Sequence, residues 1–314
     1  MLLCMAATPA FAAAPQSSFS IRFENDAFGG TDANYTNGAA LALTRAGKGL
    51  LGGIWDIGGS VGGKRYATYE LAQLQFTPSD LSRTNPDPAD RPYAGLLYAG
   101  CTTHLQRDDS FHSLKLIAGV AGPASLAEAA QRFTHRVFGY NVPHGWSSQI
   151  KNEPVANLVY EYRHRYHLTP RDGAFSVELI PLAGGFLGNY LIQAEAGAQF
   201  RIGYHPDDFG ATVLRGIGFL PFPQEEGAHH NWGFYAYAGG TANLVGRNLT
   251  LDGNTFTQSR SVEKRLFLPA TEFGASLWTQ WFQATFSYVM WGREFYGQPE
   301  REDYGSVLLS FFFR

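Results

Sequence analysis

Polar and apolar side chains alternate along this sequence in long segments that recur from its first fifty residues to its last ten. In residues 192–202 the even positions are all Ile, Ala or Phe, whereas the odd positions are Gln, Glu, Gly and Arg. Residues 282–288 show the same period of two. Because successive side chains of a β-strand point to opposite faces of a sheet, each segment predicts a strand with one apolar and one polar face.

The length of these segments favours a membrane barrel over a soluble β-sandwich. They run for about 10–16 residues, whereas sandwich strands average about 5–6 and a tilted strand needs about 9–11 to cross a bilayer. Only 16% of the residues are charged. Aromatic side chains gather near the segment ends, as in the interfacial girdles of membrane barrels. They are Tyr66, Tyr93, Tyr98, Tyr166, Tyr190, Tyr204, Trp232, Trp278, Trp281 and Trp291.

We therefore expect an all-β protein, a transmembrane antiparallel up-and-down β-barrel of about twelve strands, because lipid requires every backbone polar group to be paired. The predicted strands lie near residues 17–26, 34–44, 66–77, 92–105, 110–120, 154–168, 173–187, 190–204, 231–246, 264–280, 281–292 and 304–313. An even number places both termini in the periplasm and the longer loops outside. Two connections, residues 45–65 and 205–230, are long for periplasmic turns, and the sequence offers no reason for their length.

The first twelve residues are predicted to be a signal peptide, which leaves residues 13–314 as a single barrel domain. Leu2 to Phe11 is a short apolar run, followed by the small-x-small cleavage pattern Ala10-Phe11-Ala12. After cleavage only Cys101 remains, so no internal disulfide is expected. The net charge of −3 gives no electrostatic reason to expect a nucleic-acid partner, and we expect a monomer.

The longest predicted outer loop, residues 121–153, contains one good helix signal. Ser125 followed by Glu128 is the pattern of a capping box, and Gly139 suits the C-cap. Two stripes at helical spacing follow. The apolar stripe is Leu126, Ala130, Phe133 and Val137, and the polar stripe is Glu128, Gln131 and His135.

Polar stretches converge at the outer end of the predicted barrel. Glu24-Asn25-Asp26, residues 34–38 and residues 90–95 all fall there, beneath the loop helix, and Asp26 and Thr36 share the inward parity of their strands. Such convergence predicts an active site. Each motif also has a structural interpretation, as a packed histidine, as turn chemistry, or as a rim salt bridge made by Asp90-Arg91. The motifs of serine hydrolases, zinc proteases and nucleotide-binding loops are missing.

The motifs resemble those of the lipid A 3′-O-deacylases of the outer membrane. The resemblance rests on Glu24-Asn25-Asp26, Thr31-Asp32, residues 35–38, residues 90–95, residues 120–123, Gln131, His135-Arg136, Gly139, Gly145-Trp146, Gln149 and Glu153-Pro154. It implies a bacterial outer-membrane location and a calcium-dependent hydrolase. Such an enzyme removes the 3′-linked acyl group, usually an acyloxyacyl chain, from lipid A of the surrounding lipopolysaccharide.

Residue roles follow from the resemblance alone. His135 would be the general base that activates water, and Asn25, Asp26 and Thr36 would be site residues borne by the strands. Asp26 would also be a Ca²⁺ ligand. Arg83 would assist the oxyanion, and Gln131 precedes the histidine by one helical turn, as in the family. Asn141 stands where some members carry an acidic residue.

Two other functions remain open from the sequence. One is another outer-membrane esterase, such as a phospholipase that acts on glycerolipids. The other is a non-enzymatic barrel, either a narrow pore or a structural protein with an idle site.

Overall fold

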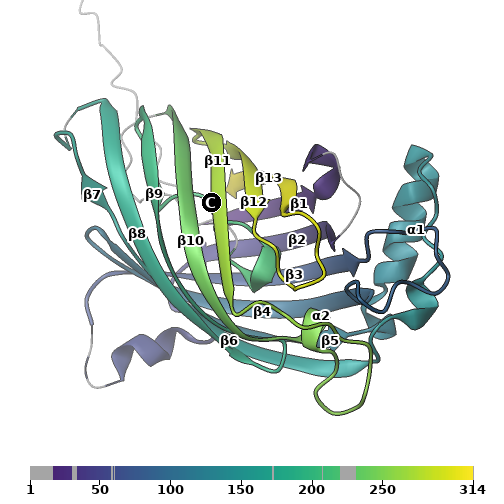
Figure 1. Ribbon diagram of the computed structural model, residues 1–314. Coiled ribbons are helices and arrows are strands. Elements are labelled where there is room, and N and C mark those ends of the chain that lie inside the picture. The colour runs from purple at the N-terminus through teal and green to yellow at the C-terminus, as the bar shows by residue number, and fades with distance from the viewer. Residues whose placement is uncertain are drawn as a thin grey trace, which may run out of the picture.

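The strands close into a twelve-stranded antiparallel barrel (Figure 1). The computed structural model describes residues 17–29, 34–57, 59, 61–171, 173–206, 208–219 and 231–313. The strands are β1 (Ser17–Asn25), β2 (Asn34–Ala46), β3 (Lys64–Thr77), β4 (Ala94–Arg107), β5 (Ser110–Ala121), β6 (Glu153–His164), β7 (Tyr166–His167), β8 (Phe175–Gly188), β9 (Leu191–Tyr204), β10 (Trp232–Asn248), β11 (Phe267–Thr279), β12 (Phe282–Trp291) and β13 (Glu302–Phe313).

The ring closes because β1 pairs with both β2 and β13, and β6 pairs with both β5 and β8. The short β7 also pairs with β8 and is separated from β6 by Arg165 alone, so the two pieces make one strand. The predicted fold and number of strands are thus confirmed. The predicted signal peptide, residues 1–12, lies outside the described residues.

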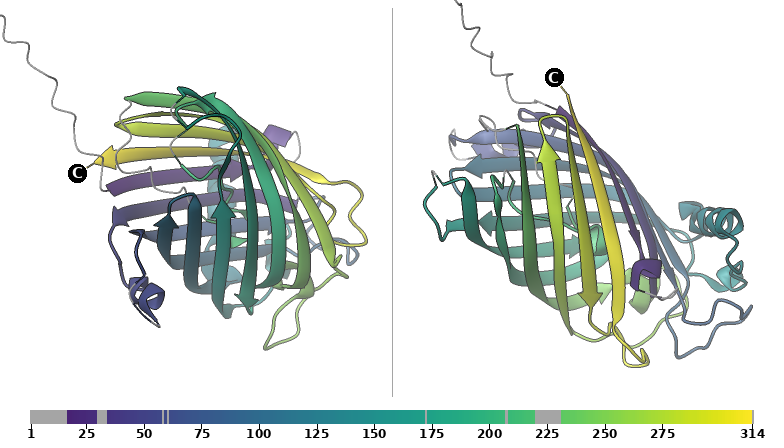
Figure 2. Two further views of the ribbon diagram at one scale, coloured as in Figure 1. Left: turned by 90° about the vertical axis from the view of Figure 1, so that its left-hand side faces the viewer. Right: turned by 90° about the horizontal axis from the view of Figure 1, so that it is seen from above.

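The barrel has two distinct ends (Figure 2). Ser17 and Phe313 are paired at one of them, which we call the terminal end. The connections β1–β2, β3–β4, β5–β6, β10–β11 and β12–β13 lie at the opposite end, which we call the loop end. The polar stretches that the sequence analysis singled out all fall at the loop end.

Alternation sorts the side chains between the lumen and the exterior. In β1, Phe19, Ile21 and Phe23 are exposed on the outer surface, whereas Arg22 and Glu24 are buried in the lumen. An apolar exterior and a polar interior are typical of barrels that sit in lipid. None of the helices in the described part of the chain is long and apolar enough to cross a membrane.

The predicted aromatic girdle is confirmed only in part. Tyr166, Trp232 and Trp281 are exposed near the terminal end, as a girdle requires. Most of the other aromatic residues that we assigned to the girdle are instead buried, because they point into the lumen or pack under loops. These buried residues are Tyr66, Tyr93, Tyr98, Tyr190, Trp278 and Trp291.

The structure accounts for the length of the connection between β9 and β10. Residues 208–219, which we call the inner segment, turn back into the barrel and include the short helix η5 (Arg215–Ile217). Phe209 stacks on Phe111 of β5 with 4.8 Å between ring centroids, and Leu214 is fully buried. The described part of this connection, residues 208–219, therefore fills the lumen and is not a simple periplasmic turn.

The other long connection, between β2 and β3, packs against the outer surface of the wall near the terminal end. It contains the short helix η2 (Gly52–Asp56). Trp55 Nε1 donates to Thr103 Oγ1 at 3.0 Å, and Arg65 contacts Asp56 at 2.6 Å. These contacts hold the connection against β3 and β4.

Candidate functional site

The loop helix α1 (Ala127–Phe138) packs on the outer face of the wall at the loop end (Figures 1 and 2). It contacts β3 and β4. A Cβ at Gly95 would collide with Ser125 and Ala127, so the glycine permits the close approach. Gln73 Nε2 donates to the carbonyl oxygen of Ser125 at 2.7 Å. Gly95 and Gln73 have the outward parity of their strands, so α1 covers the outside of the barrel.

The start of α1 differs from the predicted capping box. Ser125 belongs to a preceding turn, η3 (Pro123–Ser125), and the N-cap is Leu126 with a left-handed φ of 60°. Glu128 accepts from Arg132 at 2.9 Å instead of returning to the cap. The predicted C-cap is confirmed, because Gly139 has a φ of 75°.

The two predicted stripes of α1 face opposite ways. Gln131 and His135 are buried on the side toward the wall, whereas Leu126, Phe133 and Val137 are at least 60% exposed. A helix on a soluble protein buries its apolar stripe. A helix with a polar face against the wall and an apolar face outward suits a position at the edge of a lipid layer.

His135 is oriented by the chain that follows the helix. Its Nδ1 donates to the main-chain oxygen of Asn141 at 2.6 Å, and the Tyr140 ring packs edge-on at 5.7 Å. A hydrogen bond from Nδ1 to a carbonyl leaves the lone pair of the neutral ring on Nε2. The carbonyl at position 141 thus provides a contact that does not depend on an acidic side chain.

Gln131 lies one turn before His135 and is also fixed by a neighbour. Its Oε1 accepts from Trp146 Nε1 at 2.7 Å, and Trp146 packs on Tyr93 at 4.9 Å. Its Nε2 is buried and has no hydrogen-bond partner among the described residues. An unsatisfied buried donor is costly, so such a group is a candidate for binding a substrate oxygen.

Asn25 and Thr36 meet on the adjoining part of the wall. Asn25 Nδ2 donates to the main-chain oxygen of Thr36 at 2.8 Å, and Thr36 Oγ1 is 2.6 Å from Thr77 Oγ1. Thr77 ends β3, the strand on which α1 packs. The two predicted groups of site residues, on the strands and on the helix, therefore share the same outer surface.

The prediction that Thr36 points inward is wrong. A register shift between Tyr35 and Asn37 inserts Thr36 as an extra residue, a β-bulge. Tyr35 takes the inward position, where its hydroxyl donates to Glu24 at 2.8 Å. Bulges re-aim side chains in this way and are frequent beside active sites.

Three polar residues of the site were missed in the sequence. Gln73, Gln75 and Thr77 occupy the outward parity of β3, where the lower position Leu71 is exposed and apolar. Gln75 and Thr77 are nevertheless buried at the loop end. The change from apolar to polar side chains along one face was the available signal for a covered outer surface. We call α1 and the adjoining outer wall at the loop end the wall–helix site; its polar residues are Asn25, Thr36, Gln73, Gln75, Thr77, Gln131 and His135.

Asp26 and Arg83 have less defined places. Asp26 follows Asn25 directly, begins the short helix η1 (Asp26–Gly29) and is buried. The described residues hold no group of three or more His, Cys, Asp or Glu arranged for a metal ion. Arg83 has a half-exposed side chain 3.8 Å from Asp87, and its main-chain oxygen approaches Gly145 in the loop after α1.

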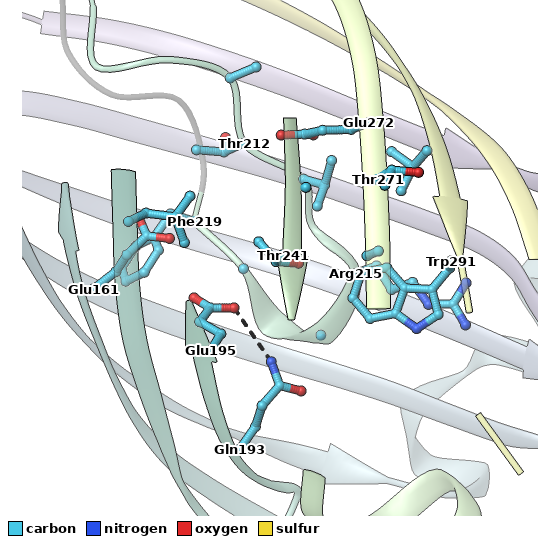
Figure 3. A pocket seen from close by; sticks show the side chains of 18 of the residues that line it. Glu161, Gln193, Glu195, Thr212, Arg215, Phe219, Thr241, Thr271, Glu272 and Trp291 are labelled. Carbon is cyan, nitrogen blue, oxygen red and sulfur yellow. Dashed lines mark hydrogen bonds between the residues drawn. The ribbon is translucent and has the colours of Figure 1, made fainter. Parts of the chain in front are cut away.

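The lumen offers a different kind of space (Figure 3). A cavity of about 80 Å³ lies beside the inner segment, lined by Glu161, Glu195, Glu272, Arg215 and Trp291 among others. This cavity lies inside the barrel and is bordered by buried charged side chains. The wall–helix site lies instead on the surface that lipid would cover.

The chain as a whole matches a family of known proteins, and its barrel matches a solved structure. The family model described as outer membrane protein LpxR matches residues 1–313. The solved structure of LpxR from Salmonella typhimurium matches with a TM-score of 0.78 at 19% identity, covering 94% of this chain and 100% of that one. The β domain of the Bordetella autotransporter BrkA gives a TM-score of 0.44 at 10% identity, covering 96% and 99%. A comparison with curated proteins gave no match.

Proposed function

Since the chain belongs to the family of outer membrane protein LpxR, we propose that this outer-membrane barrel is a lipid A 3′-O-deacylase. One observation carries the proposal: the buried His135, and an amide donor of Gln131 that has no partner among the described residues, lie on the side of a loop helix that faces the outer surface of the wall. A substrate held in the outer leaflet could reach this position without leaving the membrane. The second support is the set of motifs that resemble the deacylases of the outer membrane.

In the proposed reaction His135 acts as the general base. Nε2 takes a proton from a water molecule as that water attacks the ester carbonyl carbon. The tetrahedral intermediate then expels the sugar 3-hydroxyl oxygen, which receives the proton from His135. The Nδ1 bond to the Asn141 carbonyl stabilises the protonated ring while it holds the proton.

The oxyanion of the intermediate needs hydrogen-bond donors close to the ester carbonyl oxygen. Gln131 Nε2 is our first candidate, because it is buried and unpaired among the described residues. The Arg83 guanidinium is a second candidate, carried by a loop that touches the chain after α1. Thr36 and Asn25 shape the wall side and orient the acyl ester.

Calcium fits the oxygen donors present, although not as a cluster of carboxylates. Asp26 provides a carboxylate, and Asn25 provides an amide oxygen that accepts a hydrogen bond from the Ala27 N–H at 2.9 Å. Ca²⁺ takes roughly six to eight oxygen ligands, including amide and main-chain carbonyl oxygens and water. When bound, the ion would polarise the ester carbonyl as a Lewis acid. We propose Asp26 and Asn25 as its protein ligands.

The test is expression in a bacterial host whose lipid A keeps all its acyl chains, followed by mass spectrometry of the extracted lipid A. Active protein should shift the lipid A mass by the loss of the 3′-linked acyl or acyloxyacyl group. The His135→Ala variant should fold as a heat-modifiable barrel and leave the lipid A mass unchanged. Unchanged lipid A with folded wild-type protein and calcium present would count against the proposal.

The same extract separates the two alternatives. A phospholipase would leave lipid A intact and release fatty acids from glycerophospholipids. A barrel with an idle site would change neither lipid class.

A further inference from the structure

The inner segment is tied to the wall beneath the wall–helix site. Arg215 begins the short helix η5 of this segment, and its guanidinium is buried inside the barrel. Its Nη2 donates to Glu294 at 2.7 Å, and its Nη1 lies 2.9 Å from Glu302. The guanidinium also stacks on the rings of Tyr35 and Trp291, at 4.9 and 4.8 Å. One buried cation therefore holds two buried carboxylates from different elements.

The first carboxylate, Glu294, connects Arg215 to the residues that support α1, the helix that carries His135. Glu294 accepts a second bond from Arg91 Nη1 at 2.8 Å. Arg91 precedes Pro92 and Tyr93, and the Tyr93 ring supports Trp146, which donates to Gln131. Arg91 therefore makes a structural salt bridge, as one interpretation of the Asp90-Arg91 motif predicted, and its partner is Glu294. Its anchor is in the lumen, two residues away from a side chain that packs under α1.

The second carboxylate, Glu302, connects Arg215 to the strand residues of the site, Asn25 and Thr36. Glu302 Oε1 accepts from the Tyr35 N–H at 2.6 Å, at the bulge that turns Thr36 outward. Tyr35 in turn donates to Glu24, the residue before Asn25. Glu24 also accepts the main-chain N–H groups of Leu214 and Arg215, at 2.6 and 3.1 Å. The inner segment therefore binds Glu24 directly and reaches Tyr35 through Glu302. These two residues directly precede Asn25 and Thr36 in the chain.

We propose that Arg215 is a positioning residue that keeps the two parts of the wall–helix site in register from inside the barrel. This inference rests on the proposed function. Arg215 lines the small lumen cavity (Figure 3). It is buried inside the barrel, whereas α1 packs on the outer face of the wall. It acts through Glu294 and Glu302 and does not touch the substrate.

The physical reason is the cost of unpaired buried charge. Removal of one partner from a buried ion pair leaves the other charge uncompensated, so the local structure must rearrange or admit water. Here rearrangement would move the Arg91–Tyr93 anchor and the Tyr35 bulge together. A displacement of about 1 Å in a site residue can lower a rate by about 100-fold.

The experiment compares Arg215→Lys with a matched control, Arg201→Lys. Arg201 is equally buried and also contacts two carboxylates, Glu178 at 2.5 Å and Asp208 at 2.7 Å, but it holds the base of the inner segment on β9. Both variants should lose similar thermal stability. Arg215→Lys should lower kcat on lipid A micelles by about 10- to 100-fold with KM changed less than threefold. Arg201→Lys should keep kcat within threefold of the wild type.

A second measurement does not depend on activity. In a Cys101→Ser background, spin labels at exposed Ala27→Cys on η1 and Phe133→Cys on α1 report the distance between the two parts of the site. The distance distribution should broaden or shift in Arg215→Lys and stay as in the wild type in Arg201→Lys. An unchanged distribution in Arg215→Lys, or equal effects of both substitutions, overturns the inference. An inactive wild type overturns the proposed function, and the spin-label result still decides the inference.

Discussion

At the scale of single residues, the two polar atoms of the Gln131 side chain allow its support of the helix to be tested apart from its proposed role in the reaction. Its Oε1 accepts from Trp146 Nε1, while Nε2 has no partner among the described residues. Gln131→Glu keeps an acceptor for Trp146 and removes the donor, so kcat should fall by about 10²–10³, as expected for one lost oxyanion donor. The measurement is kcat on lipid A micelles at saturating calcium.

Two further variants control for charge and for packing. Gln131→Met removes the donor without adding negative charge and should lose rate to a similar extent. Trp146→Phe breaks the supporting bond but keeps Nε2, so its loss should be smaller. A Gln131→Met enzyme within threefold of the wild-type rate would remove Gln131 from the oxyanion site.

Asp26 gives a second prediction at this scale, on calcium. Chelation should abolish activity, and added Ca²⁺ should restore it. Asp26→Asn keeps the shape but loses the charge, so the calcium concentration for half-maximal activity should rise at least about tenfold, since carboxylates dominate calcium affinity. Asp252→Asn is the control, because Asp252 is a carboxylate at the same end that pairs with Lys264 at 3.0 Å. Equal calcium titrations for Asp26→Asn and wild type would exclude Asp26 as a ligand.

The sequence alone identified these residue types but not all their directions. The convergence of Asn25, Thr36 and His135 at one end was predictable from strand parity and helix spacing. The outward turn of Thr36 was not, because a single inserted residue in the register leaves no mark in the alternation. The orientation of His135 was also hidden, since its partner is a main-chain carbonyl, which every residue carries.

At the scale of elements, α1 presents an apolar stripe to its surroundings. Phe133 and Val137 are 70% and 60% exposed, next to the lipid-facing wall. If these side chains enter the outer leaflet, each contributes up to about 1.5–3 kcal/mol to lipid contact. Phe133→Ser with Val137→Ser should therefore lower activity on lipid A in bilayer vesicles at least tenfold. Activity on detergent micelles, where substrate can approach freely, should fall less than threefold.

A surface control on the same helix tests this explanation. Glu128→Gln breaks the half-exposed pair with Arg132, which is worth under about 1 kcal/mol. It should leave both activities within twofold. If the double serine variant lost activity equally in vesicles and in micelles, the stripe would serve the reaction itself and not contact with lipid.

The elements differ in how far the sequence determines them. Strand positions were predicted to within about three residues because the period of two continues to each strand end. The existence of α1 and its end at Gly139 were also predicted. Its start was not, because the left-handed turn at Leu126 is imposed by packing over Gly95 and not by local sequence preference.

At the scale of the whole molecule, the lumen is a charged interior that the inner segment completes. Lys115 pairs with Glu70 at 2.8 Å and also donates to the Gly218 carbonyl at 2.5 Å. Arg163 donates to the Ala211 carbonyl at 3.0 Å. Buried charges need such partners, because desolvation otherwise exceeds the gain from pairing. The main chain of residues 208–219 supplies acceptors that the barrel wall alone does not have.

If the inner segment fills the lumen, its removal should convert the protein into a channel. Tyr204 and Phe234 are paired in register, so Asn-Gly in place of residues 205–233 would join β9 to β10 by a two-residue hairpin turn. The freed charges would then face water and keep the lumen hydrated. We expect stepwise ionic currents in planar bilayers for this variant and no steps for the wild type.

The control shortens a connection that leaves the lumen filled, by replacing residues 255–259 in the β10–β11 loop with Asn-Gly. That variant should block current as the wild type does. Both variants should retain the β-sheet circular dichroism signal and the gel shift on heating, which show a closed ring. Because the deletion also removes Arg215, the buried partner of Glu294 and Glu302, the channel variant should lose deacylation while its outer surface stays chemically unchanged. If the channel variant conducts and still deacylates at the wild-type rate, the inner segment closes the pore but does not support the wall–helix site.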